Sequence, residues 1–150
     1  MYWAKWADAA KKYPDADVLS RETGFFKPYG VDPYGNYPGE TGYYFTNRLL
    51  FSLIHEDDRL SLKHIIIAIK TSCGTAALPK NSVTKEQPVL NLTVADAPVV
   101  VFYDEALDTV RTFSRINADT VLTFAFRDGN FIDLNSESVW TKDGQAVSGK

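Results

Sequence analysis

The sequence predicts an α+β fold that is mostly β: an N-terminal helix packed on a curved, largely antiparallel sheet or a partly open barrel, with a long aromatic loop rich in glycine and proline. Three observations predict it. An amphipathic segment opens the chain, a stretch without helical or strand period follows, and β-rich segments then recur about every 8–12 residues. The 150 residues fit a single domain, 1–150, made of a helix at 1–14, an aromatic turn-rich loop at 21–48 and a β-rich region at 62–150.

The helix is expected over residues 2–13, because apolar residues recur there at the three-to-four spacing of one helical face. The apolar stripe consists of Trp3, Trp6, Ala10 and Tyr13. The polar residues Lys5, Asp8, Lys11 and Lys12 lie largely on the opposite side. Pro14 ends the helix, since the residue before a proline avoids the helical region. The stripe is expected to pack on the rest of the fold.

A short strand at Asp17–Ser20 is expected to lead into the aromatic segment Phe25–Phe45. Its glycines and prolines exclude a long helix or a central strand, and "DPYGNYPG" predicts successive tight turns. Two interpretations are open. The rings wall a ligand pocket, or they fold under the loop and seal one end of the sheet; we favour the second, which is compatible with the first.

The segment Thr46–Lys63 is ambiguous. Its first part suits a short helix capped by Thr46 or Asn47, but "HEDDRL" then breaks the apolar pattern, and the chain is expected to be β-rich from there. The β-branched run at 63–71 is typical of a strand buried on both faces. One helical turn is expected at 81–86. Further strands are expected at 74–79, 88–96, 98–104, 109–115, 120–126 and 131–134, with hairpin turns at Asp128-Gly129 and Asp143-Gly144.

Composition excludes several function classes. The net charge is −3 and the basic residues are scattered, so nucleic-acid binding is not expected. The single Cys73 excludes an internal disulfide framework and a multi-cysteine zinc site. No apolar run approaches the ~20 residues that span a bilayer, and no signal-peptide pattern opens the sequence. We therefore expect a cytoplasmic protein with no membrane contact, no metal and no cofactor.

Polar clusters have a chemical and a structural interpretation. His55 beside "EDDR" has the residue types of a metal or general-base site, but consecutive residues do not converge on one point, and a buried Asp–Arg pair that fixes the loop is preferred. Cys73 and His64 have the residue types of a nucleophile–base pair. They lie nine positions apart, so on one uninterrupted strand they would face opposite sides, and catalysis by this pair is not expected. Asp104-Glu105, at a strand end, is interpreted as a turn rather than an acid/base pair.

Several common motifs are absent or discounted. The sequence contains no GxGxxG, phosphate-binding loop or nucleophile elbow, and no catalytic residue is assigned. Asn91-Leu92-Thr93 matches a glycosylation sequon but falls inside a predicted strand, so modification there is not expected.

Four strings resemble one bacterial and archaeal family, called domain of unknown function 3179. They are "YPDADVLSRETGFFKPYGVDPYGNY", "EDDRLSLKHIIIAI", "APVVVFYDEALDTVRTFSR" and "LTFAFRDGNFIDLNSESVWTKDGQAVSG". The resemblance covers nearly the whole chain and implies no assigned reaction. It is to the second half of a two-part domain, whose first half bears a Cys-Pro-x-Cys-Gly-Thr-Ala motif. The local "SCGTAAL" at 72–78 is interpreted as an accidental echo of that motif.

Two main hypotheses follow for function. The first is a non-enzymatic binding or assembly module, expected to form a homodimer because a half-domain exposes an apolar face that a second copy can cover. The alternative is a small enzyme or ligand sensor that binds a small molecule in a pocket walled by the aromatic loop and the Asp57–Arg59 cluster. Its candidate ligand-binding residues are Arg21, Tyr29, Asp32, Tyr34, Asp57, Asp58 and Arg59. A third possibility is a relic that folds but retains no ancestral reaction.

Overall fold

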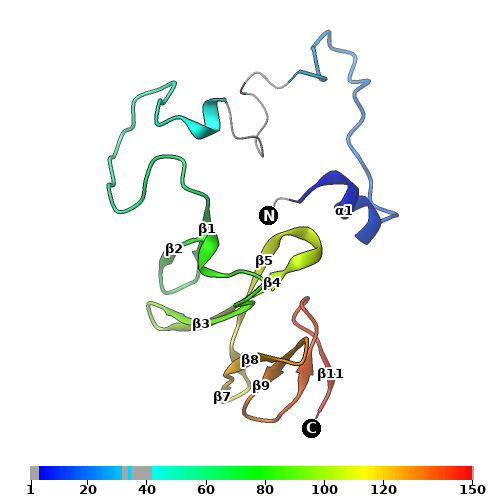
Figure 1. The fold of residues 1–150 in the computed structure, drawn as a ribbon, viewed down its shortest axis with the longest axis vertical. Coiled ribbons are helices and arrows are strands. Elements are labelled where there is room, and N and C mark those ends of the chain that lie inside the picture. Colours follow the sequence, from blue (N-terminus) through cyan, green and yellow to red (C-terminus); the bar gives the residue numbers. More distant parts are fainter. Residues whose placement is uncertain (1–3, 32–33, 35–41, 150) are drawn as a thin grey trace. The chain divides into compact units, whose positions relative to one another are not determined.

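The computed structural model describes residues 4–31, 34 and 42–149. It divides the chain into two compact units: a first unit of residues 1–14 and 66–150, and a second unit of residues 15–65 (Figure 1). The single-domain organisation stays a prediction, and each unit is described by itself. The described residues are mostly β, with one α-helix and four antiparallel sheets, none of which closes into a barrel. The α+β, mostly β class is therefore confirmed.

The first unit is built around a three-stranded antiparallel sheet. Its strands are β3 (Val89–Val94), β4 (Ala97–Asp104) and β5 (Thr109–Ser114), in that order (Figure 1). The register pairs Leu92 with Val99 and Val100 with Phe113. The middle strand, β4, is rich in β-branched and aromatic residues. This composition is typical of a strand that is covered on both faces.

Both faces of β4 are buried, and each belongs to a different core cluster. Val99 and Val101 point into one cluster, together with Ile69 of the neighbouring hairpin. Val100 and Phe102 point into the other, together with Phe124. A fully buried side chain of this kind stabilises the fold by roughly 1.5–3 kcal/mol, so β4 anchors both layers.

The strand β1 (Ile66–Lys70) pairs only with β2 (Thr75–Pro79), in a two-stranded hairpin. Ile69 is buried in the first core cluster, whereas Ile66 is 44% exposed. The expectation of a strand buried on both faces is wrong, because the packed cluster covers only one face of this hairpin. The predicted pairing of 74–79 back onto the strand is confirmed, and the expected helical turn is the 3-10 turn η2 (Lys80–Ser82).

The remaining strands form a second, four-stranded sheet and a small hairpin. The four-stranded sheet contains β8 (Phe124–Arg127), β9 (Asn130–Asp133), β10 (Val139–Trp140) and β11 (Ala146–Ser148). The small hairpin joins β6 (Ile116–Asn117) to β7 (Thr120–Val121). Both predicted Asp-Gly hairpins are present; at the first, Asp128 and Gly129 have φ of 51° and 80°, as a two-residue hairpin turn demands. The strand expected at 120–126 is divided between β7 and β8.

Asn91 joins the two main sheets. Its side-chain amide donates to the Phe124 carbonyl oxygen at 2.8 Å, and its side-chain oxygen accepts the Phe124 N–H at 2.9 Å. The side chain thus imitates one step of a β ladder between β3 and β8. A glycan on this amide is incompatible with these two bonds, in agreement with the expectation that the sequon is not used.

The helix α1 spans Trp6–Lys12, shorter than expected, and lies against the 3-10 turn η3 (Glu105–Leu107). The packing of the predicted stripe is mixed. Trp6 is 66% exposed, whereas Ala10 is half-buried. Lys12, from the predicted polar side, is also half-buried and pairs with Asp104, so ion pairs contribute to the docking of α1; Trp3 lies outside the described residues.

The second unit has little regular structure among its described residues. It contains the 3-10 turn η1 (Tyr43–Phe45), and the strand expected at Asp17–Ser20 is not formed. The helix expected after Thr46 is also not formed, and the Lys63 ammonium contacts the carbonyl oxygens of Tyr43, Thr46 and Arg48 there. A helix starting at Thr46 needs two of these oxygens for its own hydrogen bonds. No helix in the described part of the chain is long and apolar enough to cross a membrane.

Candidate functional site

The predicted ligand-binding residues all belong to the second unit. The Tyr29 hydroxyl is 2.7 Å from the Thr23 hydroxyl, which closes a short loop. Arg21 and Asp58 are exposed. Asp32 lies outside the described residues. Within the described part of this set, Asp57 and Arg59 contact each other, and the assignment of a ligand to the set stays a prediction.

Asp57 and Arg59 form the expected pair. Arg59 Nε donates to both Asp57 carboxylate oxygens, at 2.9 and 3.0 Å, and the backbone N–H of Arg59 donates to the same carboxylate at 3.1 Å. The Arg59 hydrogen bonds lower the pKa of Asp57 to about 2. The pair is exposed rather than buried, with the two side chains 54% and 85% accessible. It fixes a local turn, and Arg59 is already engaged.

Three tyrosines of the aromatic loop pack together. Ring centroids of Tyr43 lie 5.7 Å from Tyr34 and 5.8 Å from Tyr44, and Tyr34 and Tyr44 are 6.4 Å apart. These are the tilted and edge-on contacts that aromatic pairs prefer. Part of the aromatic segment is therefore a small ring-packed core, as the structural interpretation expects.

Lys63 completes this core and was missed by sequence reasoning. Its Nζ lies 3.4 Å from the Tyr43 ring centroid. The same ammonium donates to the carbonyl oxygens of Thr46 at 2.7 Å and Arg48 at 2.6 Å, and to that of Tyr43. A lysine that ends a polar run carries no local signal for this role, because its partners lie 15–20 positions earlier in the chain.

Around this tyrosine–lysine core, the second unit bears an exposed apolar surface. We define this surface as the large apolar residues of the unit that are more than about 60% accessible: Val18, Leu19, Phe25, Phe26, Val31, Phe51 and Ile54. Leu19, Phe26 and Ile54 are almost fully accessible. Exposed large apolar side chains, when they gather into one patch, mark an interaction surface more often than a lone exposed residue does.

A charged cluster occupies one end of β4 in the first unit. The Asp104 carboxylate is fully buried and accepts from Lys142 at 2.7 Å, Lys12 at 3.1 Å and Arg111 at 3.4 Å. The strand register explains part of the arrangement, because Arg111 stands opposite Phe102 and so shares a face with Asp104. Asp143, in the β10–β11 turn, also pairs with Lys12 and Arg111.

The cluster holds Asp104 ionised. Burial alone raises the pKa of Asp104, but hydrogen bonds from Lys142 and Lys12, together with their charges, outweigh burial and lower it. An ionised carboxylate whose oxygens are occupied by three cations is poorly placed to move protons. Its evident role is to join α1 and the β10–β11 turn to the central sheet. Glu105, its neighbour, pairs with Lys85 at 2.7 Å on the surface.

A second buried carboxylate organises the four-stranded sheet. Asp133 accepts from the Trp140 indole N–H at 2.8 Å and from the backbone N–H of Ser136 at 2.7 Å. Burial raises the pKa of Asp133, whereas the bonds from Trp140 and Ser136 lower it, and the net direction is down. Sequence reasoning missed this carboxylate, whose partners are a tryptophan and a turn that become neighbours only when the sheet forms.

The remaining candidates are dispersed. Cys73 is exposed in the β1–β2 turn of the first unit. His64 belongs to the second unit, where its backbone N–H donates to the Ser61 carbonyl oxygen at 3.1 Å. The two residues do not share one strand, since β1 begins after His64. Among the described residues, no group of three or more His, Cys, Asp and Glu side chains is arranged to hold a metal ion.

Comparison with known proteins bears on the whole chain. No curated protein and no solved structure matches it. A family model described as "Protein of unknown function (DUF3179)" matches residues 1–150. The resemblance found in the four sequence strings is thereby confirmed, and the chain belongs to this family of proteins of unknown function.

Proposed function

We propose that the chain is a non-enzymatic binding or assembly module, and that it forms a homodimer through the exposed apolar surface of the second unit. The observation that carries the proposal is the accessibility of Leu19, Phe26 and Ile54 on a unit whose own core is only a few rings and one lysine. Self-association about a two-fold axis covers such a surface with an identical one.

The energetics favour association. Burying one large apolar side chain contributes roughly 1.5–3 kcal/mol, so a few such side chains per subunit offset the cost of bringing two chains together. The Asp57–Arg59 turn and the Lys63 contacts hold the surface in part, which reduces the ordering cost of binding. Phe25, Phe26 and Phe51 also supply the aromatic side chains that dominate interface energetics.

The test is the molar mass in solution, measured by light scattering coupled to gel filtration at tens of micromolar protein. A dimer is expected, with the double variant Phe26→Ser/Phe51→Ser shifted toward monomer. The matched control is Val147→Ser, since Val147 is 61% exposed but lies in the first unit. A wild-type chain that runs as a clean monomer, or a control that dissociates as much as the double variant, would refute the proposal.

A further inference from the structure

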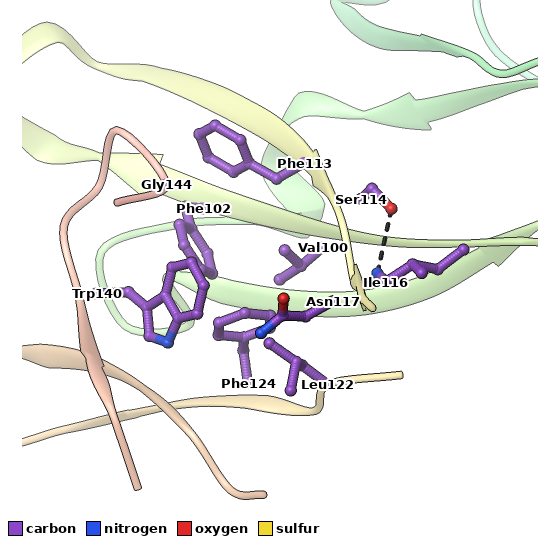
Figure 2. A pocket seen from close by; sticks show the side chains of 10 residues that line it. All are labelled: Val100, Phe102, Phe113, Ser114, Ile116, Asn117, Leu122, Phe124, Trp140 and Gly144. Carbon is purple, nitrogen blue, oxygen red and sulfur yellow. Dashed lines mark hydrogen bonds between the residues drawn. The ribbon is translucent and has the colours of Figure 1, made fainter. Parts of the chain in front are cut away.

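A pocket of about 130 Å³ opens within the first unit, between the central sheet and the four-stranded sheet. It lies on the face of β4 that carries Val100 and Phe102, opposite the Ile69 face. Figure 2 shows the lining side chains. They are Val100, Phe102, Phe113, Ser114, Ile116, Asn117, Leu122, Phe124, Trp140 and Gly144.

Four of the ten lining residues are aromatic, and their rings contact one another. The Phe102 ring centroid lies 5.6 Å from that of Phe113 and 5.2 Å from that of Phe124. Phe124 meets Trp140 edge-on at 5.4 Å. The indole N–H of Trp140 is held by Asp133 at 2.8 Å, so Trp140 presents its ring rather than its N–H to the pocket. A wall locked in this way requires little reordering when a ligand enters.

Two polar side chains, Ser114 and Asn117, line the pocket. The Ser114 oxygen is turned to the neighbouring backbone, where it accepts the Ile116 N–H at 3.1 Å. Asn117, labelled in Figure 2, also lines the pocket and is exposed in the strand β6. Asn117 therefore supplies both a donor and an acceptor to a bound molecule.

Size and charge limit the class of ligand. An apolar cavity of about 150 Å³ is known to hold a single benzene ring, so a pocket of 130 Å³ fits one small ring and little more. No charged side chain lines the pocket, and a charged group placed there would lose its water without gaining a partner. A ring with one uncharged polar group satisfies both limits.

We propose that this pocket is a binding site for a small uncharged aromatic molecule of the size of phenol. The ring packs on the accessible lining side chains Phe113, Ile116 and Trp140, and the polar group forms a hydrogen bond with Asn117. The site is separate from the apolar surface proposed for dimerisation, because every lining residue belongs to the first unit.

The probe is phenol, titrated into the full chain while the indole N–H resonance of Trp140 is followed by NMR; a Trp140→Phe variant identifies that resonance. We expect a saturable shift at millimolar phenol, and binding of benzoate at least about tenfold weaker because of its charge. Shifts that do not saturate, or benzoate that binds as tightly as phenol, would overturn the proposal.

Two variants separate the site from general ring affinity. Asn117→Ala is expected to weaken phenol by about two- to tenfold and to leave benzene unchanged, as the loss of one hydrogen bond requires. Its matched control is Asn130→Ala, at the start of β9 and outside the lining, which is expected to bind phenol like the wild type. Leu122→Phe is expected to fill the pocket and abolish binding. Because that variant can fail to fold, Asn117→Ala decides: equal phenol affinity for Asn117→Ala and wild type rejects the assigned contact.

Discussion

The two units differ in how their side chains are packed. In the first unit a middle strand divides its side chains between two clusters, and buried carboxylates take their partners from distant parts of the chain. In the second unit a single ammonium gathers backbone carbonyls beside three tyrosine rings, while large apolar side chains remain accessible. The first arrangement buries its large apolar side chains in two clusters, and the second leaves several of them exposed. We expect mutations to affect stability mainly in the first unit and association mainly in the second.

The largest contrast is expected between Phe102 and Phe51. Phe102→Ala removes a ring that is 1% exposed and stacked on Phe131 at 4.3 Å, and we expect a loss of about 3–5 kcal/mol in the free energy of unfolding. Phe51→Ala removes a ring that is 84% exposed and is expected to change the free energy of unfolding by at most about 0.5 kcal/mol. Chemical denaturation of both variants at low protein concentration measures the difference. Equal losses would mean that the second unit has a core of its own around Phe51.

The second-largest loss in the free energy of unfolding is expected for a substitution in the charged cluster around Asp104. Asp104→Asn leaves Lys12, Arg111 and Lys142 close together without their central carboxylate. We expect a loss of about 2–3 kcal/mol, below the ~3–5 of a fully buried pair, because the cations are partly exposed and screened. Glu105→Gln, which breaks only a surface pair with Lys85, is the control and is expected to have little effect.

The pH dependence of the same cluster gives an independent measurement. The pKa of Asp104 is lower in the folded chain than in the unfolded one, so the folded state binds fewer protons. The stabilisation is therefore complete above the unfolded pKa of ~3.9 and is lost as the pH falls through the lower folded value. Unfolding curves between about pH 6 and 2 are expected to converge for wild type and Asp104→Asn at the acid end. A constant gap at all pH values would exclude the ionised carboxylate as the cause.

A smaller effect is expected where the β10–β11 turn meets the central sheet. A Cβ on Gly144 would stand 2.6 Å from the Phe113 ring, at a φ of +78° that already disfavours alanine. Gly129 has nearly the same φ, +80°, and open space around it. Gly144→Ala is thus expected to cost about 1–3 kcal/mol more than Gly129→Ala, from the steric clash alone. Thermal unfolding of the two variants tests this, and similar melting temperatures would show that the turn moves freely away from Phe113.

The sequence predicts the first unit far better than the second, for a physical reason. Strands β3, β4 and β5 and both Asp-Gly hairpins have local signals, namely β-branched runs and turn residues that demand positive φ. The Lys12–Asp104 contact joins residues 92 positions apart, and no local pattern encodes it. The amphipathic pattern of α1 likewise gives no sign that Lys12, from the predicted polar side, is half-buried in ion pairs while Trp6 is exposed.

In the second unit, the spacing of apolar residues predicts a helix that the structure does not form. Thr46 and Leu49 to Ile54 have the spacing of a capped helix, yet the Lys63 ammonium takes the carbonyl oxygens on which the first turn depends. A pair of Arg59 with Asp57 or Asp58 was predicted, because Arg59 follows these two aspartates and the string resembles that of the family. Its exposure was not, because burial depends on what surrounds the turn rather than on the turn itself.

The smallest effect on global stability, and the sharpest test of the comparison, is expected from Lys63→Met. The substitution keeps much of the side-chain length but removes the charge that binds the carbonyl oxygens of Tyr43, Thr46 and Arg48 and lies over the Tyr43 ring. We expect faster amide hydrogen exchange over residues 43–50 and unchanged exchange in β3, β4 and β5, with a change of about 1 kcal/mol or less in global unfolding. Lys27→Met, an exposed lysine of the same unit, is the control. If the helix predicted from the sequence appears in the variant as new helical NMR contacts after Thr46, then Lys63 is what suppresses it. If exchange over 43–50 is unchanged, the tyrosine rings alone hold this unit and the ammonium does not organise it.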